Sequence, residues 1–164
     1  MGHDGPTALV LTRQAVPVCT DGSAVATGAA VVRSADDAHL VLLATGSEVH
    51  VCVAAAEKLA AEGLRASVVS MPSWDRFAAQ PLSFRTSVLP TGVPVLSVEA
   101  ATTFGWERYA DDSIGIDRFG ESAPGDVALD RLGINVDHVV ARARALVAGS
   151  PNGAASSSAR SPGA

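Results

Sequence analysis

The amino-acid sequence predicts an α/β protein, a three-layer α/β/α sandwich built around a mostly parallel sheet. Two observations lead to this prediction. Segments with the pattern of strands alternate along the chain with segments of helical pattern, as in βαβ units. The segment 39–44 is apolar throughout, which is typical of a strand buried on both faces of a parallel sheet. We therefore expect helices to cover both faces of the sheet.

The strands are expected where short apolar runs are bounded by polar or turn residues. The run at 64–70 is closed by Met71-Pro72, and the run at 93–98 leads into Glu99. The predicted strands, in chain order, are 8–11, 29–32, 39–44, 64–70, 93–98 and 114–116.

The helices are expected where apolar residues recur at helical spacing. The segment 48–62 has this spacing, with Ser47 before it as a helix N-cap and Gly63 after it as a left-handed C-terminal residue. Asn135 is the expected cap of the last helix, and Pro81 divides two shorter helices. The predicted helices, in chain order, are 48–62, 74–79, 82–88, 104–110, 126–132 and 136–148.

Composition indicates a soluble single-domain protein. The 164 residues are 48% hydrophobic and 18% charged, which excludes disorder for the body of the chain. The net charge of −5 without a basic stripe argues against a nucleic-acid partner. No apolar run approaches the roughly 20 residues of a membrane span, so no membrane partner is expected. The two cysteines, Cys19 and Cys52, suggest neither a disulfide framework nor a zinc site, and we expect a cytoplasmic protein.

The sequence divides into three parts. Residues 1–27 hold one short apolar strand and a linker, and residues 28–148 form the main α/β domain. Residues 149–164 read GSPNGAASSSARSPGA, and such small, polar and turn-forming residues cannot bury enough surface to offset the entropy of ordering. We therefore expect this last part to be a disordered tail.

The strand-to-helix turn at Gly46 and Ser47 is a candidate anion site. The N-terminus of a helix after a parallel strand offers free amides and a positive dipole end. No Gly-x-Gly-x-x-Gly or Walker pattern occurs there. Two interpretations stay open: the turn binds a small anion, or Ser47 only caps the helix.

Other polar residues allow both a functional and a structural interpretation. Arg13 follows an apolar strand and could grip a phosphate, or it could be a surface arginine. Glu99 lies at the strand end where open α/β sheets bind ligands, but no partner for acid–base work is evident. Asp117 and Arg118 are more typical of ion pairs or of loop anchoring than of ligand binding. No metal-ligand spacing and no complete catalytic constellation is found.

Seven segments, in order and at sensible spacing, match one family. They are GPTALVLTRQ (5–14), ATGSEV (44–49), VVSMPSW (68–74), FRTSVLP (84–90), SVEA (97–100), TFGWE (103–107) and GIDRFG (115–120). The sequence resembles the C-terminal domain of transketolase, preceded by the last strand of the pyrimidine-binding domain. The resemblance extends over about residues 5–147 and implies a Rossmann-like three-layer fold, with 1–27 as that end strand and a linker.

The resemblance also implies an activity. The family transfers two-carbon ketol units between sugar phosphates, in the pentose phosphate pathway, using thiamine diphosphate and a divalent metal such as Mg²⁺. The Gly-Asp-Gly motif that supplies metal ligands in the family is absent from this sequence. The arginine of the family's Leu-Ser-Arg-Gln segment contacts the sugar phosphate, and Arg13 stands at that position, with Thr12 in place of the serine.

The resemblance leaves three interpretations of the chain. The first is a component or fragment of a transketolase-type enzyme, inactive without a partner chain that carries the diphosphate- and pyrimidine-binding domains, and binding sugar phosphates only when assembled. The second is a non-catalytic regulatory or interaction module that docks on a complete transketolase or binds a small anion. The third is a truncated product without a function of its own.

Overall fold

A five-stranded sheet forms the centre of the protein. The computed structural model describes residues 5–12 and 14–150. The strands are β1 (Ala30–Arg33), β2 (Leu40–Ala44), β3 (Ala66–Ser70), β4 (Val95–Val98) and β5 (Asp112–Ile114), in the order β1-β3-β2-β4-β5. All neighbouring pairs are parallel except β1 and β3. The predicted mostly parallel sheet is therefore confirmed.

The helices lie where the apolar spacing predicts them, with one addition. The short α1 was not predicted, and the expected helix at 104–110 is only a single 3₁₀ turn, η1. The helical elements are α1 (Ala24–Thr27), α2 (Glu48–Ala61), α3 (Trp74–Ala78), α4 (Leu82–Val88), η1 (Trp106–Arg108), α5 (Gly125–Arg131) and α6 (Val136–Gly149).

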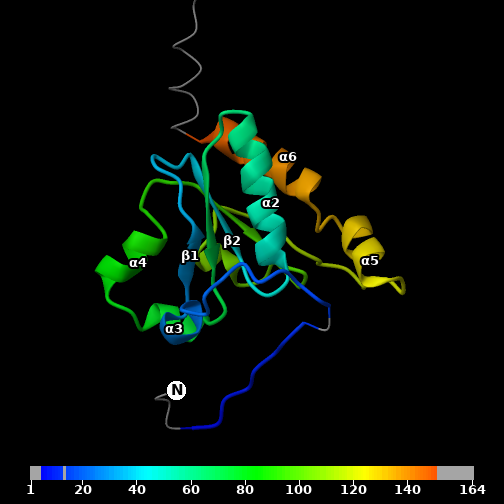
Figure 1. Ribbon diagram of the computed structural model, residues 1–164, viewed down its shortest axis with the longest axis horizontal. Helices are drawn as coiled ribbons and strands as arrows, with labels where there is room; N and C mark the ends of the chain where they lie inside the picture. The colour runs from blue at the N-terminus through cyan, green and yellow to red at the C-terminus, as the bar shows by residue number, and fades with distance from the viewer. Residues whose placement is uncertain (1–4, 13, 151–164) are drawn as a thin grey trace, which may run out of the picture.

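Side chains that alternate along the strands build one core on each face of the sheet. Leu40 and Leu42 of β2 pack with α2 and α6, which lie side by side (Figure 1). Val41 and Leu43, which point the opposite way, pack with Phe77 of α3 and the residues around α4 and η1. Because successive residues of a strand face opposite sides, an apolar run buries both faces. The predicted three-layer sandwich is confirmed.

The predicted helix ends are partly correct. Gly63 follows the end of α2 with φ +82°, as expected of a left-handed C-terminal residue. The Asn135 side chain accepts a 2.8 Å hydrogen bond from the backbone N–H of His138 and caps α6. Ser47 precedes α2 but makes no cap bond, because its hydroxyl donates instead to Oε1 of Glu48 at 2.6 Å.

The predicted strand at 8–11 is wrong for the chain by itself. Leu9, Val10 and Leu11 lie in an extended arm outside the sheet, and they are 66%, 92% and 74% exposed. A strand needs a partner backbone to accept and donate its hydrogen bonds, and the described part of the chain gives this arm none. The arm runs below the rest of the protein in Figure 1.

The ends of the last helix and of the last strand differ slightly from their predicted positions. The last helix extends to Gly149, one residue past its predicted end, and residues 151–164 of the predicted tail lie outside the described residues. The predicted strand at 114–116 begins earlier, at Asp112. Within residues 5–12 and 14–150, no helix is long and apolar enough to cross a membrane.

Candidate functional site

The carboxyl ends of β2 and β4 form the switch point of the sheet. These strands are neighbours, yet the chain leaves them in opposite directions. After β2 it passes through α2 on one face to β3, and after β4 it passes through η1 on the other face to β5. In open α/β sheets the ligand crevice lies where two connections diverge in this way. The candidate site is therefore the region between residues 45–48 and Glu99.

Glu48 is a buried acid at this point. It is the first residue of α2, and it is only 3% exposed. Its Oε1 accepts the Ser47 hydroxyl at 2.6 Å, and the positive end of the α2 dipole favours a negative charge there. Sequence reasoning did not single out Glu48, because nothing in the pattern shows that this acidic first-turn residue is buried.

Glu99 carries the second carboxyl group of the site. Its backbone N–H donates to the carbonyl of Ile114 at 3.0 Å, which fixes the residue at the end of β4. Partial burial, and then the charge of Glu48, raise the pKa of Glu99 to about 7. A carboxyl group with such a pKa can both donate and accept a proton near neutral pH.

The turn at Gly46 and Ser47 lies close to the carboxylate of Glu48. Gly46 has φ +56°, and a Cβ built there would have Oε2 of Glu48 as its nearest neighbour, at 4.0 Å. An anion at this turn would therefore meet the negative charge of Glu48 as well as the free amides of α2. The anion site at Gly46 and Ser47 stays a prediction.

Asp117 anchors the loop that follows Glu99. Its carboxylate accepts hydrogen bonds from the hydroxyls of Thr102 and Thr103 at 2.8 and 2.7 Å, and from the backbone N–H of Thr103 at 2.9 Å. These bonds lower the pKa of Asp117, with those from Thr103 the strongest cause. Arg118 pairs with Glu121 at 3.4 Å. The structural interpretation of both residues is confirmed.

The N-terminal arm crosses the molecule near this end of the sheet. Residues 6–8 line a cavity of about 450 Å³ together with Ser73, Asp75 and Arg76 at the start of α3. Further along, Nε2 of Gln14 lies 3.7 Å from where a Cβ on Gly125 would be, at the start of α5. Arg13 itself lies outside the described residues, so its role stays a prediction.

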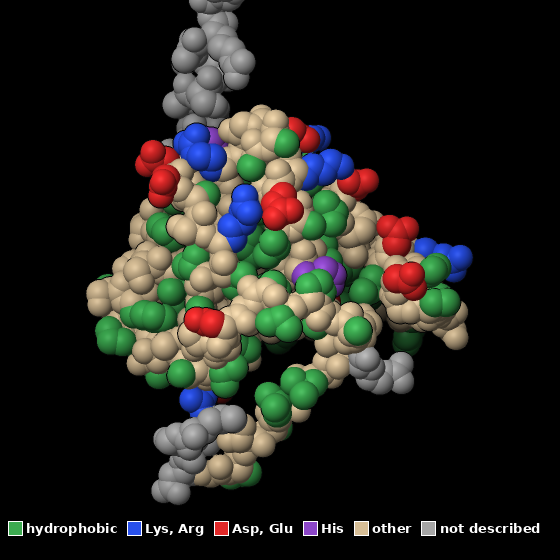
Figure 2. Space-filling model, viewed as in Figure 1, with side chains coloured by type: hydrophobic (Ala, Val, Ile, Leu, Met, Phe, Trp, Pro, Cys, Tyr) green, Lys and Arg blue, Asp and Glu red, His purple; other side chains and the backbone are tan. Residues whose placement is uncertain are grey.

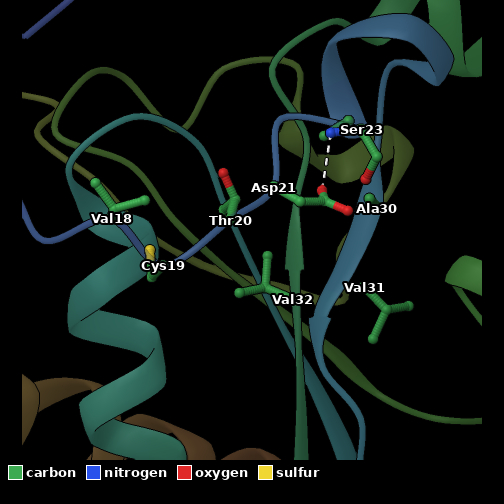
Figure 3. Close-up of a pocket in the computed structure, with 9 residues that line it drawn as sticks. Val18, Cys19, Thr20, Asp21, Ser23, Ala30, Val31 and Val32 are labelled. Atoms are coloured by element: carbon green, nitrogen blue, oxygen red, sulfur yellow. Dashed lines mark hydrogen bonds between the residues drawn. The ribbon is translucent and has the colours of Figure 1, made fainter.

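A further cavity of about 490 Å³ lies between the linker and the edge strand β1 (Figure 3). Val18, Cys19 and Asp21 line it from the linker side. The Asp21 carboxylate accepts the backbone N–H of Ser23 at 2.9 Å, so it serves the turn before α1. No local pattern in the sequence predicts this cavity.

The described residues do not fit a divalent-metal site. Within residues 5–12 and 14–150, no three His, Cys, Asp or Glu side chains come together as metal ligands would. Glu48 and Glu99 are only two carboxyl groups, and one of them binds its proton up to about neutral pH. The described residues therefore bring together no set of side chains that fits the divalent metal expected from the resemblance.

Comparisons with known proteins agree with the resemblance. The family described as "Transketolase-like TK C-terminal domain" matches residues 28–135. The transketolase of Geobacillus stearothermophilus is 50% identical over 155 residues, which cover 88% of this chain and 23% of that protein. Transketolase 1 of Escherichia coli is 44% identical over a similar range. The chain thus spans about 23% of the length of these relatives.

Solved structures give the same result. The transketolase of Leishmania mexicana superposes with a TM-score of 0.79 at 45% identity, over 83% of this chain and 20% of that one. A chain described as "Split gene transketolase, inactive beta4 tetramer" superposes with a TM-score of 0.63 at 25% identity, over 82% of this chain and 48% of that one.

Proposed function

The chain belongs to the transketolase family, and from this premise we propose that it serves as the C-terminal domain of an enzyme that transfers two-carbon ketol units between sugar phosphates. In this role residues 28–148 are the C-terminal domain, and residues 1–27 are the end strand of a pyrimidine-binding domain with its linker. The enzyme would act in cytoplasmic sugar-phosphate metabolism, in the pentose phosphate pathway.

The exposure of the N-terminal arm is the observation that supports this proposal. Leu9, Val10 and Leu11 have the composition of a buried strand, yet water surrounds them, while the sheet of the main domain is covered on both faces. Figure 2 shows hydrophobic side chains in the open along the arm. An unpaired apolar strand is a template for another sheet. We infer that the arm completes a sheet formed by residues beyond this chain's 164.

Arg13 lies directly after this apolar run. By the resemblance it contacts the phosphate of the sugar, and a guanidinium binds phosphate with two parallel hydrogen bonds. Pairing of the arm with a foreign sheet would fix the backbone on the N-terminal side of Arg13. The same contact that completes the sheet would then position the arginine.

The cofactors would be held by the diphosphate- and pyrimidine-binding domains. The chain spans about 23% of the length of its relatives, and we infer that these two domains lie outside residues 1–164. The likeness to a split-gene transketolase chain supports an assembly of this kind. The alternative of a separate regulatory module is not favoured, because the proteins compared are transketolases and the matches run over nearly nine-tenths of the chain.

Reconstitution tests the proposal. The full chain is mixed with a polypeptide that carries the two cofactor-binding domains and ends before the position of Gly5, with thiamine diphosphate and Mg²⁺ present. Ketol transfer from a ketose phosphate to an aldose phosphate is then followed. We expect activity in the mixture well above that of either polypeptide alone, and a mixture no more active than its parts would contradict the proposal.

Two arginine variants separate phosphate binding from assembly. In the mixture, Arg13→Ala should raise KM for a phosphorylated acceptor by about tenfold or more, since a charged hydrogen bond is lost. It should leave KM for an unphosphorylated acceptor nearly unchanged. The matched control Arg33→Ala removes a positive charge on β1, where Arg33 lies 3.6 Å from Glu57, and should change neither value. Equal effects on both acceptors would contradict the role of Arg13.

A further inference from the structure

A second cavity, remote from the switch point, is lined by two arginines and a tyrosine. It has a volume of about 390 Å³ and lies on the face of the sheet covered by α3, α4 and η1. Arg85 comes from α4, and Arg108 and Tyr109 come from the end of η1. The remaining lining residues are mostly apolar: Phe77, Ala78, Thr86, Leu89, Pro90 and Val95.

Two buried donors of this cavity's lining have no partner. In the described part of the chain, Nε of Arg85 and the hydroxyl of Tyr109 are shielded from water and make no hydrogen bond. A buried donor left unsatisfied costs roughly 1–3 kcal/mol. Two such donors on residues that share one cavity indicate that a group with acceptor atoms belongs between them.

The charge of the cavity is also uncompensated. No acidic residue lines it, although the protein as a whole has a net charge of −5. Neither Arg85 nor Arg108 pairs with a carboxylate of the described residues. The ion pairs found there use other cations, namely Arg33, Lys58, Arg118, Arg131, Arg142 and Arg144.

Packing fixes the position of the tyrosine. The ring of Tyr109 makes edge contacts with Trp74 and Phe77, at centroid distances of 5.9 and 5.6 Å. Phe77 in turn contacts Phe84, the neighbour of Arg85, at 6.4 Å. Such aromatic pairs favour defined geometries. The tyrosine is therefore held rigidly, while the partly exposed Arg85 can adjust to admit a ligand to the shielded donors.

We propose that this cavity is a binding site for a phosphate monoester with a compact apolar or aromatic body. Two guanidinium groups balance the two negative charges of the phosphate, and the tyrosine hydroxyl adds a neutral donor. Phe77, Leu89, Pro90 and Val95 offer an apolar wall rather than partners for sugar hydroxyls. The site lies near the amino end of β4, so it is separate from the switch point and from Arg13's proposed role.

Calorimetric titration of the full chain tests this site, with phenyl phosphate as the probe. We expect saturable one-to-one binding of phenyl phosphate, and weaker binding of inorganic phosphate, glucose 6-phosphate and benzoate. Tyr109→Phe should weaken the binding of phenyl phosphate by about five- to tenfold, and Arg85→Met by at least about tenfold. The control Arg33→Met removes the same charge elsewhere and should change the affinity by less than about twofold.

The variants distinguish a binding role from a structural one. The Tyr109 hydroxyl has no partner to lose and is buried at a cost, so Tyr109→Phe should unfold at the same urea concentration as the parent protein or at a higher one. This variant therefore keeps the test valid even if Arg85→Met folds poorly. Absence of saturable binding of phenyl phosphate, or equal affinity in the parent and Tyr109→Phe, overturns the site. Tighter binding of benzoate or of glucose 6-phosphate overturns the proposed ligand class.

Discussion

Glu48 at the start of α2 and Glu99 directly after β4 lie beyond the carboxyl ends of two adjacent parallel strands, and the charge of Glu48 helps to raise the pKa of Glu99 to about 7. Burial is the larger cause, because it disfavours the ionised form. The free energy of folding therefore depends on whether Glu99 is protonated, and this changes near neutral pH. The place where this sheet would be expected to bind a ligand is therefore also a place where the free energy of unfolding falls as pH rises toward neutral.

Glu99→Gln should relieve this pH dependence. The folded protein holds the Glu99 proton up to about pH 7, while the unfolded chain releases it near the ordinary value of 4.5. The free energy of unfolding therefore falls as pH rises from about 4.5 to 7. Glutamine resembles the protonated acid but cannot ionise, so the variant does not lose this part of the free energy of unfolding as pH rises. We expect the stability of Glu99→Gln relative to the parent to rise by about 1 kcal/mol between pH 5 and 8, after allowance for solvent screening.

Urea unfolding at several pH values measures this difference. Subtracting the parent curve removes the contributions of other carboxylates, such as Asp117, whose lowered pKa acts in the opposite direction at acid pH. The control Glu57→Gln removes a carboxylate from the exposed side of α2 and should show no comparable rise. A constant difference between Glu99→Gln and the parent would disprove the coupling.

Gly28→Ala should destabilise the protein far more than Gly63→Ala. Both glycines have positive φ, +88° and +82°, so an alanine is strained by a similar amount at either position. At Gly28, however, a Cβ would overlap the backbone of Phe77 in α3 and of its cap residue Ser73, whereas at Gly63 it would meet nothing within 4 Å. We expect a loss of about 1 kcal/mol at Gly63 and about 3 kcal/mol or more at Gly28. Urea unfolding would contradict this if the two losses were equal.

The fold could be predicted from the sequence because its core positions repeat with a simple period. The apolar run 39–44 and the helical spacing of 48–62 are local patterns, and both elements lie where these patterns place them. The antiparallel direction of β1 could not be predicted, since a strand of four residues carries no mark of its direction. The arm at 8–11 could not be placed for a similar reason. An apolar strand pattern does not indicate which other strand will pair with it.

The two candidate sites could not be predicted fully, because their residues come together only in the folded protein. Glu99 was a candidate because strand ends are common ligand positions, but its partner Glu48 is distant in sequence and becomes a partner only through the pairing of β2 with β4. Arg85 and Tyr109 likewise line one cavity although they belong to separate elements. Residues on separate elements can be brought together by a sheet order that the sequence does not state.

Cys52 should be unreactive until the protein unfolds. Its thiol is fully buried, and burial, followed by the charge of Glu48, raises its pKa well above the ordinary value. The thiolate is the reactive form, so both access and ionisation are lost. With an aromatic disulfide reagent at pH 8, one thiol, that of the partly exposed Cys19, should react quickly and the second only in urea. Fast loss of a thiol from native Cys19→Ser would contradict this.

Asn135→Ala should remove the cap of α6 and lower the free energy of unfolding by about 1 kcal/mol. The Asn135 side chain accepts the backbone N–H of His138 at 2.8 Å, and its amide also donates to the Asp130 carboxylate at 2.9 Å. Asn135→Ser separates these two bonds, because serine keeps a cap acceptor but cannot reach as an amide does. If capping is the main contribution, urea unfolding should show that serine restores most of the stability lost in alanine. If serine and alanine are equally destabilised, the bond to Asp130, rather than the cap, holds the start of α6 against the end of α5.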